Sequence, residues 1–181
     1  MRIQTERLVL RRPARADADA LEHVYGDPDV MRHIGDGSAW SRRRIEEALE
    51  LWSSFWEDDG FGQLVVQRRE DGFAIGDVGL LAWDPELWRP GSRARIGPHV
   101  EIEIGWTLGR EFWGRGYASE AAAAVREWAL GELRLMRLIS LIQPGNDRSI
   151  RVAEKLGERY ERDVVTRRGQ TAHLYALEAP Q

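Results

Sequence analysis

Strict alternation of apolar and polar positions predicts a strand at 100–108, VEIEIGWTL, which is also rich in β-branched side chains. The stretch 133–143 has instead the apolar density of a buried strand. Residues 61–69 and 73–83 indicate a hairpin joined through the turn sequence EDG. Further strands are expected at 5–12 and, as a pair with a turn at 167–170, in the tail up to about Leu177.

Helical periodicity predicts four helices between these strands. In 41–58 the apolar residues recur at i, i+3, i+4 and i+7, and Ser41 is a suitable N-cap. An alanine-rich face marks 117–130, and Gly131 ends this helix. Shorter helices are expected at 16–27, with a possible further turn around 27–34, and at 144–157, beginning near Asn146 and ending at Gly157.

The segment 84–98 shows no periodicity and carries three of the seven prolines. Long loops of this kind are usually functional or mobile. The chain has 43% hydrophobic and 31% charged residues, which are globular values. Because no repeat or linker interrupts the pattern, we expect one α+β domain over residues 1–181.

Composition excludes several kinds of site. Without cysteine there is no disulfide, thiolate zinc site or cysteine nucleophile. The four histidines lack metal-ligand spacing, so we expect no metal. A net charge of −4 gives no electrostatic basis for nucleic-acid binding. No apolar run approaches the roughly 20 residues that span a bilayer, and the charged N-terminus is no signal peptide, so no membrane association and a cytoplasmic location are expected.

The most distinctive stretch is the junction at 111–122, EFWGRGYASEAA. A turn with two glycines precedes the predicted helix, whose first N–H groups have no intrahelical partners. With the helix dipole these donors form an anion site, and glycine permits close approach of a phosphate. The motif is neither a Walker loop nor the dinucleotide fingerprint. Taken alone, it is either a ligand site or a tight turn. A small excess of basic residues accompanies it, eight against six acids from Arg110 to Lys155.

In this setting the chain resembles the GNAT acyltransferases, in particular their RimJ/RimL-like branch. The likeness rests on TERLVLR at 5–11, EIGWTLGREFWGRGYASEA at 103–121 and NDRSIRVAEKLG at 146–157, and it covers nearly the whole chain. It implies a three-layer α+β fold, with a mixed, mostly antiparallel central sheet of about seven strands flanked by about four helices. It also implies acetyl-CoA as the acetyl donor, with its pyrophosphate on the glycine turn. Glu111 departs from the family pattern, which has a cation or an amide there.

The same resemblance implies which residues contact the donor. They are Trp106, Thr107, Leu108, Arg110, Gly114, Arg115, Gly116, Tyr117, Ala118, Asn146 and Ser149. Asn146 would bond the pantetheine arm or the acetyl end. Ser149 would donate to the leaving sulfur, because Ala153 stands where many members of the superfamily have a tyrosine. Without the resemblance, Asn146 would be only an N-cap and Ser149 a surface residue.

Two carboxylates on the 100–108 strand are candidate bases. Glu101 and Glu103 point to one face, about 7 Å apart, and shielding from water would make each raise the other's pKa. The family's Glu-(Ile/Leu)-Gly element matches residues 103–105, so Glu103 is the expected catalytic base and Glu101 a weaker second. An exposed strand face with ordinary acids is the alternative. By the same resemblance, a backbone N–H of 103–107, splayed from its neighbour, would bond the acetyl oxygen.

Tryptophans at the ends of elements are candidates for an acceptor site or a dimer contact. These are Trp40, Trp83 and Trp88. We assign Trp40 and Trp83, together with Glu101, to acceptor binding. The tryptophans on apolar helix faces are expected in the core: Trp52, Trp56 and Trp128.

Two functions of different class stay open. The first is an N-acetyltransferase that uses acetyl-CoA to acetylate a primary amine directly, either a protein N-terminus or a small molecule, and that forms a homodimer by family habit. The second is a catalytically inactive CoA-binding module with a regulatory or interaction role. A more distant third is an unrelated α+β binding domain without affinity for CoA. The sequence does not identify the acceptor amine.

Overall fold

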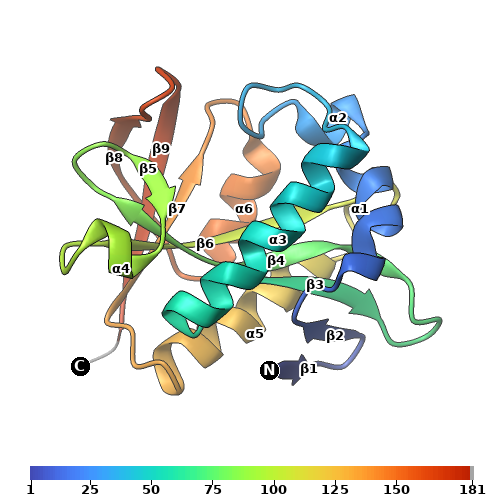
Figure 1. Cartoon of the computed structure of the whole chain (residues 1–181). Coiled ribbons are helices and arrows are strands. Elements are labelled where there is room, and N and C mark those ends of the chain that lie inside the picture. Colours follow the sequence, from blue (N-terminus) through green and yellow to red (C-terminus); the bar gives the residue numbers. More distant parts are fainter. Residues whose placement is uncertain (180–181) are drawn as a thin grey trace.

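The computed structural model describes residues 1–179 and centres on a mixed sheet (Figure 1). Within these residues nine strands follow the order β1-β2-β3-β4-β6-β7-β9-β8, with β5 paired to β4. All neighbouring strands are antiparallel except β6 and β7. The strands are β1 (Arg2–Gln4), β2 (Leu8–Arg11), β3 (Gln63–Arg68), β4 (Ala74–Asp84), β5 (Arg89–Gly91), β6 (Glu101–Leu108), β7 (Arg137–Ile142), β8 (Arg159–Val165) and β9 (Thr171–Glu178).

Six α-helices lie in the same described range. They are α1 (Ala18–Tyr25), α2 (Pro28–Met31), α3 (Arg42–Asp59), α4 (Arg93–Ile96), α5 (Tyr117–Gly131) and α6 (Asp147–Lys155), with 3₁₀ turns at Arg15–Asp17 and Arg110–Phe112. The expected fold class is confirmed. The structure has two strands and two helices more than the expected seven and four, and these extra elements are short. Strands β1 and β5 have three residues each, and helices α2 and α4 have four each.

The helices cover both faces of the sheet. Figure 1 shows α3 in front of the central strands and α5 behind them. Side chains alternate between the two faces along β4. Asp77 accepts a hydrogen bond from Tyr25 of α1, whereas Val78 packs in the cluster that contains Ala121 and Val125 of α5. The face that carries Asp77 is therefore the one that α1 and α3 cover.

Two expected strands are shorter than their sequence pattern. In 5–12 the chain forms a turn before β2, because Thr5 Oγ1 accepts the Leu8 N–H at 3.0 Å. The strand expected from residue 133 begins only at Arg137. Its first residues belong instead to the C-terminal connection of α5, and Arg134 there has a positive φ of 53°.

The segment 84–98 is more ordered than its composition suggests. It contains β5 and α4, and Trp88 is buried in a cluster with Ile139 and Leu174. The expectation that Trp88 lines an acceptor site or a dimer contact is therefore corrected, because its ring is part of the core. The three tryptophans expected in the core are buried: Trp52, Trp56 and Trp128.

The central feature of the sheet is the separation of β6 from β7. These parallel strands share one residue pair, Glu103 with Ile139. Beyond it β6 stays paired with β4 as far as Leu108, and β7 stays paired with β9 as far as Ile142. The two strands therefore diverge, and the sheet opens beside the last residues of β6.

Candidate active site

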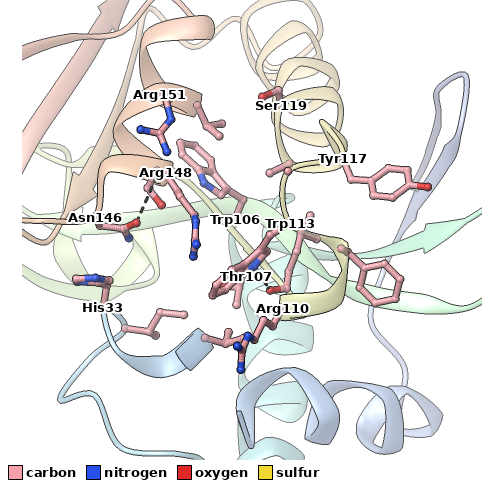
Figure 2. Close-up of a pocket in the computed structure, with 18 of the residues that line it drawn as sticks. His33, Trp106, Thr107, Arg110, Trp113, Tyr117, Ser119, Asn146, Arg148 and Arg151 are labelled. Carbon is pink, nitrogen blue, oxygen red and sulfur yellow. Dashed lines mark hydrogen bonds between the residues drawn. The ribbon is translucent and has the colours of Figure 1, made fainter. Parts of the chain in front are cut away.

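A cavity of about 480 Å³ lies where the sheet opens (Figure 2). The end of β6, the glycine turn, the first turn of α5, one side of α6 and residues 29–34 form its walls. Ten of the eleven residues implied by the family resemblance line it: Trp106, Thr107, Leu108, Arg110, Gly114, Gly116, Tyr117, Ala118, Asn146 and Ser149. The structure thus brings together residues that are far apart in the sequence, since Trp106 and Ser149 are separated by 43 positions.

Arg115 is the exception, because it does not line the cavity. Its carbonyl oxygen accepts a hydrogen bond from Arg7 Nη1 at 2.9 Å. The same Arg7 forms an ion pair with Glu120 in the first turn of α5 at 2.6 Å. Arg115 therefore helps to fix the turn through its backbone, while its side chain lies away from the cavity.

The glycine turn leaves backbone donors free at the cavity. Gly114 and Gly116 have φ of 73° and 80°, a conformation that other residues adopt only with strain. Gly116 is the N-cap of α5 and provides no side-chain cap. The first N–H groups of this 15-residue helix therefore point out of the helix and add to the positive end of its dipole. Such an arrangement fits a phosphate group.

Cations complete this cavity, and sequence reasoning did not single most of them out. Arg148, Arg151 and Lys155 follow the i, i+3, i+7 spacing along α6 and line it. Figure 2 shows Arg148 and Arg151 on the side facing Trp106. The Arg148 guanidinium lies 4.3 Å from the centre of the Trp113 ring. The excess of basic residues between 110 and 155, together with this helical spacing, was the sequence feature that could have indicated a cationic wall.

Asn146 and Ser149 occupy the N-terminus of α6. The Asn146 side chain accepts the Ser149 N–H at 3.3 Å, so it is an N-cap. Both residues also line the cavity, and Figure 2 shows Asn146 opposite the end of β6. The capping bond uses the Asn146 carbonyl oxygen and leaves its NH₂ group for another partner. Capping and ligand binding are therefore compatible here.

A second cavity of about 290 Å³ adjoins the first. Six residues line both: His33, Ile34, Trp106, Thr107, Asn146 and Ser149. Glu103 and Trp83 line only the second cavity. The two cavities meet at the end of β6, so a group bound in one can reach a group bound in the other.

Glu103 lies at the point where β6 leaves β7. Its Oε2 accepts a hydrogen bond from Trp83 Nε1 at 2.6 Å, and its Oε1 accepts the Leu141 N–H at 3.4 Å. Burial raises the pKa of Glu103 to about 7, and the two hydrogen bonds oppose this rise. A carboxyl group with this pKa can exchange a proton near neutral pH.

The carboxyl group that is coupled to Glu103 is Glu158, not Glu101 as expected. Glu158 is 2% exposed, and its burial raises its pKa to about 8, with a smaller contribution from the charge of Glu103. Ser140 Oγ lies 2.8 Å from Ile104 O and 3.1 Å from Glu158 Oε1. A hydroxyl has one proton, so both bonds form only when Glu158 is protonated and donates the second.

Two of the three side chains assigned to acceptor binding lie elsewhere. Glu101 pairs with Arg137 at 3.1 Å and lines neither cavity. Trp40 stacks on Tyr25 with ring centres 4.3 Å apart, and it also lines neither cavity. Trp83 does line the second cavity, where it holds Glu103.

Within residues 1–179 there is no cluster of three or more His, Cys, Asp or Glu side chains arranged to hold a metal ion. None of the helices described there has the length and apolar character required to cross a membrane. His33 is the histidine that lines both cavities, a position that its sequence context did not reveal.

Known proteins resemble this chain in sequence and in fold. Residues 7–159 match the acetyltransferase (GNAT) domain. The chain is 30% identical over 161 residues to the uncharacterized N-acetyltransferase YnaD of Bacillus subtilis, which is 89% of this chain and 84% of YnaD. A GNAT-family acetyltransferase from Bacillus anthracis superposes with a TM-score of 0.78 at 25% identity over 100% of both chains.

The fold is also that of RimL, the ribosomal L7/L12 alpha-N-protein acetyltransferase solved in complex with coenzyme A. The TM-score is 0.77 at 15% identity, over 98% of each chain. The domain match extends over most of the chain and includes the glycine turn, both cavities' shared residues and Glu103. This protein is therefore an acyltransferase that belongs to the GNAT acetyltransferase family.

Proposed function

We propose that this protein is an acetyl-CoA-dependent N-acetyltransferase that transfers the acetyl group directly to a primary amine. The observation that carries the proposal is the meeting of two cavities of different chemistry beside Glu103. One has phosphate-binding features and five cationic side chains, Arg32, Arg110, Arg148, Arg151 and Lys155. The other contains a carboxyl group suited to accept the proton of an amine. A donor and an acceptor can therefore react without a covalent enzyme intermediate.

Binding of the donor rests on the first cavity. The N–H groups at the start of α5 would hold the pyrophosphate, and the α6 cations would neutralise its charge. Asn146 would bond the pantetheine arm through its NH₂ group. The acetyl end would then lie at the shared residues, next to Glu103.

Backbone geometry offers a donor for the acetyl oxygen. Ile104 O accepts from Ser140 of β7, so the backbone groups of Ile104 face β7. The register with β4 continues without a shift from Glu101 to Leu108, so the next residue to face this side is Trp106. Its N–H lies beyond the last β6–β7 pair and would point into the opening. One such donor is typically worth about 3–4 kcal/mol of transition-state stabilisation.

The proposed transfer then needs two proton movements. The neutral amine attacks the carbonyl carbon, a carbon–nitrogen bond forms and the carbon–sulfur bond breaks. Glu103 accepts the proton from the nitrogen, directly or through water, and Ser149 donates a hydrogen bond to the departing sulfur. Ser149 is a weak acid, so its contribution is stabilisation of the thiolate, which solvent can then protonate.

The proposal extends to a cytoplasmic location and a homodimer, as the family resemblance implies. Sedimentation of the purified protein with and without CoA would measure the oligomeric state. The acceptor is a protein N-terminus or a small amine.

Thermal unfolding with acetyl-CoA, CoA or ATP tests the proposal, followed by a thiol-release assay with a panel of amines. Ligand at 100 times its Kd adds about 2.7 kcal/mol, which is a Tm rise of roughly 5–10 °C for a chain of this length. A rise with both CoA forms and thiol release with an amine support the enzyme. A rise without turnover of any amine supports the inactive CoA-binding module, and no rise refutes both.

A further inference from the structure

The second cavity has a second carboxyl group at the end opposite Glu103. Asp77 of β4 is 3% exposed and lines the cavity. Tyr25 OH donates to its Oδ2 at 2.6 Å, and no hydrogen bond from the described residues reaches Oδ1. One oxygen of a nearly buried carboxyl group is therefore left for a ligand.

Asp77 and Glu103 lie on the same face of the sheet. Asp77 pairs with Thr107 of β6, and Glu103 pairs with Leu81 of β4, so the two acids are four rows apart on neighbouring strands. This spacing puts their Cα atoms about 14 Å apart. The Glu103 Cδ atom lies 4.0 Å from the place that a Gly105 Cβ would take, so its side chain leans toward Asp77. The carboxyl groups are then roughly 10 Å apart.

Between the two acids this face of the sheet carries the pair Gly79 with Gly105. Gly79 is covered, because Gly62 O and Gln63 Cα lie 2.5 Å from the place that its Cβ would take. A Cβ at Gly105 would meet only the Glu103 carboxyl carbon, at 4.0 Å, so this glycine leaves open space. Beside this space, Gln63 Oε1 is buried without a hydrogen-bond partner. A groove over Gly105, with the Gln63 Oε1 acceptor at its side, thus lies between Asp77 and Glu103.

The charge of the lining selects among amines. The ionisable acids of the second cavity are Asp77 and Glu103, and its described lining contains no Arg or Lys. Aromatic rings of Tyr25, Trp52 and Trp83 provide walls that also favour a cation. A carboxylate on the acceptor would be repelled, whereas a second cationic nitrogen would find a partner.

We propose that the second cavity binds a short-chain diamine, with the reacting amine at Glu103 and a second, cationic nitrogen at Asp77. This inference rests on the proposed N-acetyltransferase function and names its acceptor class. The groove floor holds the hydrocarbon chain, and Gln63 Oε1 accepts a hydrogen bond from the ligand. Asp77 is a specificity-determining residue that does not touch the reacting atoms.

The protonation state of Asp77 determines the pH at which the proposal is tested. Burial raises the pKa of Asp77 to about 7, and the hydrogen bond from Tyr25 opposes this rise. At pH 8 the carboxyl group is mostly ionised, and a cationic nitrogen beside it favours that form further. Binding of the second nitrogen is therefore tested at pH 8.

The test compares three acceptors that share a six-carbon chain: 1,6-diaminohexane, hexylamine and 6-aminohexanoate. We expect kcat/KM of the wild-type protein to be at least tenfold higher for the diamine than for hexylamine, and lowest for the amino acid. Asp77→Asn keeps the shape of the side chain and should bring the diamine-to-hexylamine ratio close to one. Asp84→Asn makes the same change on β4 outside both cavities and should keep the ratio.

A second variant separates binding from folding. Gly105→Ala adds a methyl group to the groove floor without contact to a neighbour closer than 4.0 Å. It should raise KM for the diamine severalfold while the CoA-induced Tm rise stays. Equal use of diamine and hexylamine by the wild-type protein, or a stronger preference for an N-terminal peptide, would overturn the inference while the enzyme function stands. Absence of thiol release with every amine would instead refute the proposed function itself.

Discussion

Opposing effects act on the Glu103 carboxyl group at the scale of single residues. Burial beside the end of β6 raises its pKa, and the N–H groups of Trp83 and Leu141 favour its ionised form. The sequence indicated the residue through the Glu-Ile-Gly element. It did not indicate the indole that holds it, because Trp83 is 20 positions away and reaches Glu103 only through the β4–β6 register.

Replacement of Glu103 should remove the proposed base. We expect Glu103→Gln to lower kcat by about 10²–10⁴. In the wild-type protein, kcat should rise with pH through about 7 as Glu103 ionises, and the variant should lack this limb. The dependence of kcat on pH is measured by thiol release at saturating concentrations of both substrates. Glu101→Gln is the matched variant on the same strand, and its carboxylate pairs with Arg137 away from both cavities, so an equal loss there would contradict the assignment.

Removal of the Trp83 indole N–H should shift the same limb. This donor favours the ionised form of Glu103, so Trp83→Phe is expected to raise the pKa of Glu103. The acidic limb of the kcat profile then moves to higher pH, while the plateau at high pH changes less. A limb that stays in place would show that the hydrogen bond does not tune the base.

At the scale of elements, the connection from β6 to α5 is held from outside. Arg7, just before β2, bonds the Arg115 carbonyl and pairs with Glu120 of α5. Thr5 adds a hydrogen bond to Glu120 at 2.6 Å. The N-terminal turn therefore fixes the glycine turn against the helix.

A glycine in this turn should be required for CoA binding. Gly114→Ala places a residue with a side chain at φ 73°, which costs about 1–2 kcal/mol, and puts a Cβ at the cavity wall. We expect a Tm lower by a few degrees and at least tenfold weaker CoA binding, measured by calorimetry.

Gly169→Ala is the matched control for this strain. Gly169 has φ 78° in the β8–β9 turn and lines neither cavity. Like Gly114, it has no atom within 4 Å of the place that its Cβ would take. It should lose similar stability and keep its affinity for CoA. Equal loss of affinity in both variants would mean that the Gly114 effect is one of general stability.

At the scale of the whole molecule, buried carboxyl groups oppose the folded state as pH rises. Glu158 titrates near its ordinary value when unfolded and at about 8 when folded. Between these values the native state holds a proton that the unfolded state has lost, so the free energy of unfolding falls with rising pH. Asp77 and Glu103, with pKa values of about 7, act in the same direction.

Glu158→Gln should therefore stabilise the protein at alkaline pH. The amide keeps a donor for Ser140 and cannot ionise, so the gain over wild type should grow from about pH 4.5 and be complete above about 8, on the order of 5 kcal/mol. Urea unfolding at pH 5, 7 and 9 measures this gain. Glu161→Gln, an exposed acid of β8 that pairs with Arg137, should run parallel to wild type. A constant difference at all three pH values would contradict ionisation as the cause.

The sequence by itself determined the local features of this protein. Period and capping placed α3 and α5, because Ser41 caps the first and Gly116 starts the second through interactions within a few residues. The glycine turn is likewise readable, since positive φ and free N–H groups depend only on the adjacent chain. Glu103, Asn146 and Ser149 were indicated by the resemblance to the GNAT family, because without it Asn146 would be only an N-cap and Ser149 a surface residue.

Only the tertiary structure decided which distant side chains share one environment. The separation of β6 from β7, the union of two cavities and the coupling of Glu103 to Glu158 instead of Glu101 depend on strand order and register, which no local pattern encodes. Trp88 belongs to the core and Asp77 faces the groove for the same reason. Burial and pKa are properties of packed surroundings, and these form from segments far apart in the chain.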